Sequence, residues 1–225
     1  MNNDLETVLK NIFKVKVIDA TIGNSDYVSL DLSTSNKNLE SVDISSAESV
    51  EIFIENYLKI NQAKIAFGGY NEKRNLYKRS SVFKNNEVEE RDIHIGLDLW
   101  IKAGTSVLAA LDGNVHSFQN NTSLGDYGPT IILQHEIENV IFYTLYGHLS
   151  LESIKNLSIG QEFLKGEKLA TLGNFPINGD YAPHLHFQII KNIENYTGDY
   201  PGVCSENTLD YYLDNCPDPN LLLKI

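Results

Sequence analysis

The feature that most constrains the fold is a succession of short β-rich runs joined by tight turns, which begins near residue 90. Asp112-Gly113 has the composition of a hairpin turn, and Glu138-Asn139 and Lys165-Gly166-Glu167 are further turns between apolar runs. Short strands separated by turns are typical of an antiparallel sheet and not of a βαβ array. The sequence therefore predicts a mainly β fold, α+β overall. The expected strands cover residues 107–111, 115–118, 130–134, 140–149, 163–172 and 184–190.

The first 65 residues have a different texture. Apolar residues at helical spacing follow Asp4 and continue to Phe13, which predicts a short helix. Short strands are expected around the turn at residues 23–26, and residues 33–46 are polar and predict a loop. Ser45 or Ser46 is a candidate cap for a second helix that runs to about residue 60.

Three regions follow from these patterns. Residues 1–65 are expected to form a small N-terminal α/β layer of unknown role, and residues 66–195 a β domain. Residues 196–225 are expected to be a loop-rich C-terminal extension packed on that domain, with a short helix near residues 209–213.

The formal charge of the 225-residue chain is −12. An acidic chain repels nucleic acid and anionic membrane surfaces, so neither is expected as a partner. The densest basic stretch combines Lys73-Arg74 with Lys78-Arg79, and we interpret it as a solvated face.

The chain holds no run of ~18 apolar residues, so we expect no membrane insertion. Its first residues lack the basic and apolar segments of a secretory signal. We therefore expect a cytoplasmic protein, although export by an unrecognised route stays open. In that setting Cys204 and Cys216 are expected to be reduced thiols.

Histidines occur in suggestive contexts at three places. Residues four apart on a strand share one face, so His94 and Asp98 are expected to point the same way, with Gly96 leaving the space between them open. His184 and His186 also share a face, which leaves Leu185 and Phe187 to face the core. His148 lies at the end of an apolar strand.

Together these contexts predict a metal site. Neutral imidazoles and one carboxylate suit Zn²⁺ in a tetrahedral site with one position left for water. A closed structural site is expected to use four ligands, often with cysteine, and the two cysteines of this chain are not in a C-x2-C arrangement. The pattern therefore indicates an open, catalytic site.

The order of these motifs resembles the M23 metallopeptidases, the lysostaphin-like endopeptidases that cut peptidoglycan cross-bridges. The match consists of H-x3-D at residues 94–98, Tyr-Gly-His-Leu-Ser at 146–150 and Pro-His-Leu-His-Phe at 183–187, and it covers about residues 91–190. The resemblance implies an antiparallel lysostaphin-type domain and one Zn²⁺ per chain. It implies His94, Asp98 and His186 as zinc ligands.

The same resemblance implies that His148 and His184 activate water and stabilise the transition state, and the spacing leaves open which of them is the general base. We expect the cleft to be a groove across the sheet, because peptides bind extended. A narrower resemblance, at residues 126–130, 142–148, 198–204 and 216–220, is to the M23-type domain found fused to kinase-like and class III aminotransferase domains.

Three functions stay open at this point. The first is a zinc metalloendopeptidase that acts on a peptidoglycan-type fragment or a small intracellular peptide. The second is an exported cross-bridge endopeptidase. The third is a non-catalytic M23-like domain that binds a ligand or a partner protein. The oligomeric state is open in each case.

Other candidates have less support. His116 and His135 match no motif position and are interpreted as ordinary surface or sheet histidines. Asn71 is a candidate for the upstream asparagine that blocks zinc in latent members of the family. Three tyrosines are candidates for the cleft wall, although packing is the favoured interpretation. They are Tyr77, Tyr127 and Tyr181.

Overall fold

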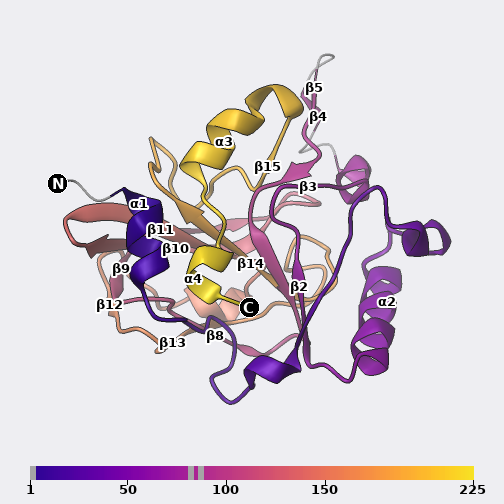
Figure 1. Ribbon diagram of the computed structural model, residues 1–225, viewed down its shortest axis with the longest axis horizontal. Helices are drawn as coiled ribbons and strands as arrows, with labels where there is room; N and C mark the ends of the chain where they lie inside the picture. Colours follow the sequence, from indigo (N-terminus) through magenta and orange to yellow (C-terminus); the bar gives the residue numbers. More distant parts are fainter. Residues whose placement is uncertain (1–3, 81–83, 86–88) are drawn as a thin grey trace.

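The computed structural model describes residues 4–80, 84–85 and 89–225. Its main element is an eight-stranded sheet with the order β1-β2-β7-β14-β11-β10-β9-β12 (Figure 1). Every adjacent pair in it is antiparallel except β1 and β2, so the predicted mainly β, antiparallel fold class is confirmed. The strands are β1 (Tyr27–Ser29), β2 (Ile65–Gly68), β7 (Leu97–Trp100), β14 (His184–Ile190), β11 (Val140–Gly147), β10 (Gly128–Ile137), β9 (Gly113–Asn121) and β12 (Glu162–Phe163).

Smaller sheets flank the main one. They are β13 (Lys168–Thr171) with β8 (Ser106–Leu108), β15 (Val203–Cys204) with β6 (Ile93–His94) and β3 (Glu72–Lys73), and β4 (Lys84–Asn85) with β5 (Glu89–Glu90). The turn between β10 and β11 is the expected two-residue hairpin, since Glu138 and Asn139 both have positive φ, at 52° and 63°.

The predicted hairpin at Asp112-Gly113 is wrong. β8 pairs with β13, whereas β9 pairs with β10 and β12, so the chain passes there from one sheet to another. The turn at residues 164–167 does the same beside it, and the Asp112 carboxylate accepts a hydrogen bond from the Lys165 amide at 2.7 Å. Each turn is a corner between sheets, which local turn chemistry does not distinguish from a hairpin.

The N-terminal residues include α1 (Leu5–Asn11) and α2 (Ala47–Ile60), the latter capped by the Ser46 side chain as expected. Phe13, expected on the apolar face of the first helix, is 89% exposed because that helix ends at Asn11. Figure 1 shows α1 beside α4 (Asn220–Leu223), and α2 at the far end of the sheet.

β1 joins the main sheet parallel to β2, with α2 in the connection. This βαβ unit departs from the expectation of a purely antiparallel sheet, and the connection of residues 30–64 is long enough for such a crossover. The N-terminal layer therefore extends the sheet of the β domain and also covers part of it.

The remaining helices are α3 (Leu209–Asn215), as expected for the C-terminal extension, and the 3-10 turns η1 (Asn24–Asp26), η2 (Lys37–Ser41), η3 (Leu76–Arg79), η5 (Leu151–Ile154) and η6 (Glu206–Thr208). Within residues 4–80, 84–85 and 89–225, no helix combines the length and apolarity needed to cross a bilayer.

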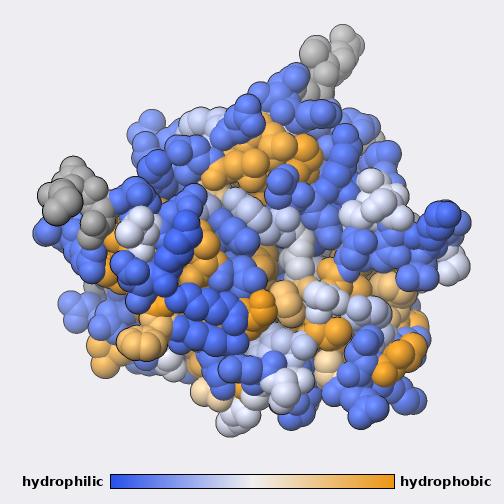
Figure 2. Space-filling view, in the orientation of Figure 1, coloured by the Kyte–Doolittle hydropathy of each residue, from blue (hydrophilic) through white to orange (hydrophobic). Residues whose placement is uncertain are grey.

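The buried apolar residues form three clusters, which hold the sheet and the helices together. Leu185 and Phe187 of β14 are fully buried in the largest apolar cluster, as expected from their alternation with the histidines. A second cluster joins α2 to the sheet through Val50, Ile54 and Trp100. A third cluster holds Cys204 and Cys216 as buried free thiols. The face in Figure 2 is mostly hydrophilic with separate apolar areas, in keeping with the acidic composition.

Candidate active site

Adjacent strands bring His94, Asp98 and His186 together. Asp98 in β7 and His186 in β14 are direct cross-strand partners, and His94 ends β6. The His94 Nε2 atom lies 2.9 Å from His186 Nδ1 and 3.3 Å from Asp98 Oδ1, and the His186 Nδ1 to Asp98 Oδ1 distance is 3.2 Å. All three side chains are buried.

Hydrogen bonds on the far side of each ring fix the tautomers. The His94 Nδ1–H group donates to the Gly69 carbonyl at 2.8 Å, and the His186 Nε2–H group donates to the Gln188 Oε1 atom at 2.9 Å. The opposite ring nitrogens therefore carry lone pairs, which face each other and the Asp98 carboxylate. Three lone pairs directed at one point repel one another unless a cation lies between them.

The spacing of these atoms fits zinc. Zinc with N and O ligands at about 2.0–2.1 Å in a tetrahedron places its ligand atoms about 3.3 Å apart. The three separations here are 2.9, 3.2 and 3.3 Å. The donor set of two imidazoles and one carboxylate also leaves a fourth position free, so the residues fit an open zinc site.

Gly96 provides the space for this cluster, although not on a single strand as expected. The chain breaks between β6 and β7 at Ile95-Gly96, and the two strands belong to different sheets. A Cβ atom on Gly96 would lie 2.3 Å from Cε1 of His186. The expected convergence of His94 and Asp98 is therefore confirmed, and the gap beside Gly96 is filled by the His186 ring.

His148 and His184 lie beside the cluster as a second pair. His148 directly follows β11 with a positive φ of 62°, and its Nδ1–H group donates to the Asn178 carbonyl at 2.7 Å. The His184 Nδ1–H group donates to the Ala182 carbonyl at 2.7 Å. The two ring centroids are 4.2 Å apart, and His184 Nε2 is 3.8 Å from Asp98 Oδ1.

Burial keeps both imidazoles of this pair neutral. Burial and the neighbouring His184 and His186 lower the pKa of His148 well below its ordinary value. Burial likewise lowers the pKa of His184. Because each Nδ1 carries the hydrogen, each Nε2 has a free lone pair that can accept a proton.

Arg74 is part of the site, and its interpretation as a solvated residue is wrong. Its side chain is 1% exposed, its Nη1 donates to Asp98 Oδ2 at 2.6 Å, and its Nε donates to Glu72 Oε1 at 2.6 Å. Its guanidinium lies over the Trp100 ring, 5.6 Å from the centroid. Gly69 leaves room for it, since a Cβ there would be 1.9 Å from Arg74 Nη2.

Arg74 fixes both the orientation and the charge of Asp98. Burial alone would raise the pKa of this carboxyl, but His94 and Arg74 outweigh burial and hold the pKa well below its usual range. Burial lowers the pKa of His94 to about 4. Both candidate ligands are therefore in the deprotonated form that binds a metal ion.

A pocket of about 200 Å³ lies over these residues. Tyr77, Tyr127 and Tyr181 are buried and also line it, so the packing and the cleft-wall interpretations hold together. Its walls also include Leu32, Ile44, Ser46, Ala47 and Val50 from the N-terminal layer, and Tyr196 and residues 199–203 from the C-terminal extension. The expected groove across the sheet is thus a pocket with walls from all three regions of the chain.

The remaining candidates lie outside the pocket lining. Asn71 is exposed, so nothing places it against the ligand cluster. His135 is buried between the Asp112 carbonyl and the Thr144 hydroxyl, and His116 packs against the Tyr143 ring. Both are sheet histidines, as expected.

Sequence reasoning missed Arg74, Glu72 and Gln188. Gln188 had a usable signal, because it follows His186 by two residues and so shares its strand face. Arg74 had none, because only the tertiary fold brings the residue after β3 into contact with Asp98 of β7.

Comparison with known proteins agrees with this geometry. Residues 92–197 match the model of peptidase family M23. A protein from Haemophilus influenzae described as an uncharacterized metalloprotease is 34% identical over 118 residues, which is 51% of this chain. This chain spans only 23% of the length of that relative.

Two solved structures are also similar. The catalytic domain of the antimicrobial peptidase lysostaphin from Staphylococcus simulans is 24% identical, with 54% of this chain and 80% of that chain covered and a TM-score of 0.37. A zinc containing peptidase from Vibrio cholerae is 26% identical, with 48% of this chain and 30% of that chain covered and a TM-score of 0.34.

Proposed function

We propose that the chain is a zinc-dependent metallopeptidase that hydrolyses a peptide bond with a metal-activated water. The observation that carries the proposal is the convergence of the lone pairs of His94, Asp98 and His186 within 3.3 Å. These residues would hold one Zn²⁺ per chain. The match of residues 92–197 to a peptidase family supports the same conclusion.

Zinc bound there would lower the pKa of a water molecule towards about 7 and polarise the scissile carbonyl. The chain supplies the proton transfers. Nε2 of His148 or His184 is free to take the proton of the attacking water, and the resulting imidazolium returns it to the leaving amine. To stabilise the developing negative charge, the second imidazole would first take up a proton from solvent at Nε2, because its Nδ1 hydrogen is already donated to a backbone carbonyl.

The hydrogen bonds from Nδ1 to Asn178 and Ala182 keep these two rings from rotating. Fixed orientation matters because an imidazole that must reorient during the reaction loses much of its advantage. Arg74 acts through Asp98 and is a positioning residue.

The substrate we propose is a peptidoglycan-type fragment or another small peptide. Lysostaphin is described as an antimicrobial peptidase, which supports a peptide bond as the target of this chain. We also propose kinship with the M23-type domains fused to kinase-like and aminotransferase domains. In support, Asp126, Tyr127 and residues 199–203, from the motifs behind that resemblance, line the pocket.

The test is hydrolysis by the zinc-loaded full chain. His148→Ala should keep zinc and lose about 10²–10⁴-fold in rate, whereas His186→Ala should lose both. His116→Ala is the matched control, because that histidine lies outside the pocket lining. An unchanged rate in either test variant would refute the mechanism. Zinc binding without hydrolysis of any peptide would favour the alternative, a non-catalytic M23-like domain that binds a ligand or partner protein.

A further inference from the structure

An apolar wall closes the pocket on the side of His184. Leu32, Ala47 and Val50 form it, and two of them, Leu32 and Val50, belong to the same buried cluster as Trp100. The Trp100 ring stacks on His184 with a centroid separation of 5.9 Å. Trp100 therefore connects the beginning of α2, through Val50, to one of the two proton-transfer residues.

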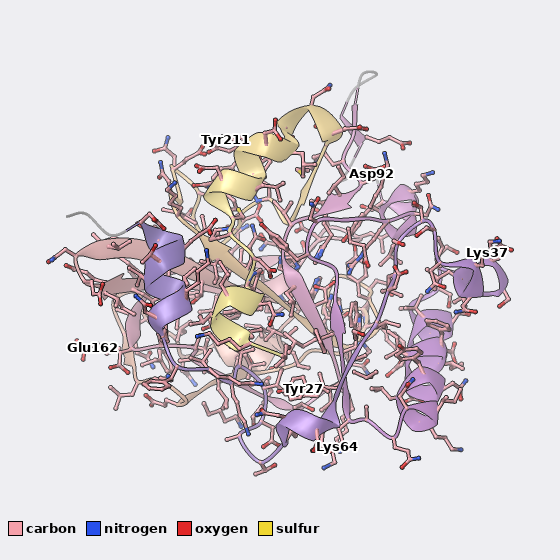
Figure 3. The ribbon with its side chains drawn as sticks, in the orientation of Figure 1. Tyr27, Lys37, Lys64, Asp92, Glu162 and Tyr211 are labelled. Carbon is pink, nitrogen blue, oxygen red and sulfur yellow. The ribbon has the colours of Figure 1, made fainter. Side chains whose placement is uncertain are left out.

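The polar segment before α2 lies outside this wall. Figure 3 shows Lys37, on the 3-10 turn η2, at the outer edge of the molecule on the same side as α2. Ile44 and Val50 line the active-site pocket on one side and a second cavity under this segment on the other. The wall is therefore a folded layer of residues 32–50 and not a single side chain.

A backbone wall bounds the pocket next to His186. A Cβ atom on Gly202 would lie 1.9 Å from the Tyr127 hydroxyl and 3.1 Å from Cε1 of His186. The Tyr127 hydroxyl also donates to the Tyr200 carbonyl at 3.1 Å. No space for a substrate chain remains between Gly202 and the side chains of Tyr127 and His186.

These walls limit the length of the substrate. An extended peptide that is cut in its middle needs a groove open at both ends. The volume of about 200 Å³ is only modestly larger than a cavity of about 150 Å³ that holds one benzene molecule. Such a pocket accommodates one or two residues and not a cross-linked strand.

We propose that the site takes dipeptides and tripeptides, of which one or two residues enter the pocket, and that an apolar residue next to the scissile bond rests against the wall formed by Leu32, Ala47 and Val50. This inference rests on the proposed function for the hydrolytic step. The preference for length and for an apolar residue is a property of binding, so it is measurable without turnover.

Trp100 provides the binding readout. It is the only tryptophan of the chain and lines the pocket, so its fluorescence reports occupancy. The experiment titrates the zinc-loaded full chain with Ala-Leu, Ala-Asp, a ten-residue peptide that contains Ala-Leu internally, and soluble cross-linked peptidoglycan fragments. Hydrolysis of each compound is followed in parallel.

Val50→Phe narrows the pocket, and Ile52→Phe is the matched control on the same helix, where Ile52 is 51% exposed. We expect Ala-Leu to bind at least about tenfold more tightly than the other three ligands. Val50→Phe should weaken that binding about tenfold or more with zinc content unchanged, and Ile52→Phe should not. Val50→Ala, which widens the pocket, should admit larger apolar residues and covers the case in which Val50→Phe fails to fold.

The outcomes separate the two proposals. Selective binding of Ala-Leu without hydrolysis of any compound would refute the proposed function and support the inference. Hydrolysis of the ten-residue peptide or the cross-linked fragments at least as fast as Ala-Leu would support the function and refute the inference. Equal binding of all four ligands would also refute it.

Discussion

Gly96 offers a sharp test, because its effect on the metal site can be worked out from distances. In a Gly96→Ala variant the new methyl would lie 2.3 Å from His186 Cε1 and 2.5 Å from its Nε2. Ordinary contacts begin at 3.4 Å, so the ring must retreat by about 1.1 Å (3.4 minus 2.3). The φ angle of Gly96 is not in the left-handed region, so the backbone accepts alanine.

Metal sites tolerate ligand displacements of only about 0.2 Å. Gly96→Ala should therefore weaken zinc binding by at least about 10–100-fold, which is the loss seen when weaker perturbations disturb ligand orientation. The assay is competition with a chromophoric chelator on the full chain. Gly23→Ala is the control, because its Cβ would meet nothing closer than 3.4 Å. A Gly96→Ala variant that binds zinc as tightly as the wild type would show that His186 is not a ligand in this position.

Further predictions concern Arg74, the pair of His148 and His184, and the dependence of stability on pH. Arg74→Met leaves the buried Asp98 carboxylate and the partly buried Glu72 carboxylate without their partner, so it should lower the free energy of unfolding by about 3–5 kcal/mol. The exposed Lys10→Met should lower it by less than about 1 kcal/mol. Both are measured in urea, and similar values would contradict a buried ion pair between Arg74 and Asp98. His148→Ala and His184→Ala should each keep one zinc by mass spectrometry, and loss of zinc in either would make that residue a ligand. Burial lowers the pKa of His135 to about 4 from 6.5, so between these values the unfolded chain binds the extra proton and stability falls as pH falls, by about 1.4 kcal/mol per pH unit. His135→Gln should flatten that slope in denaturation curves, and an unchanged slope would contradict the assignment.

The candidate site was largely predictable, because its signal is local. The two-residue alternation of His184 and His186 needs only a strand to place both on one face, and β14 is that strand. Gly96 could be assigned from the same alternation, although the strand proved to be broken there. The tautomers that direct the lone pairs depend on the Gly69 carbonyl and on Gln188, and only the fold supplies the first.

The pocket walls were not predictable, because they come from long-range packing. No local pattern tells that α2 lies over Trp100, or that Gly202 approaches His186. The prediction of a hairpin at Asp112 was wrong for a related reason. A tight turn has the same composition whether it joins two paired strands or, as near Asp112 and Gly166, two different sheets. Arg74 was misread because charge density in sequence says nothing about burial.

The most direct test of the central claim is the metal content of the purified full chain, measured by mass spectrometry beside His186→Ala. About one zinc per wild-type chain, lost in the variant, is the result expected from the lone pairs of His94, Asp98 and His186. A wild-type chain that holds no transition metal after zinc is supplied at neutral pH would contradict the metallopeptidase assignment.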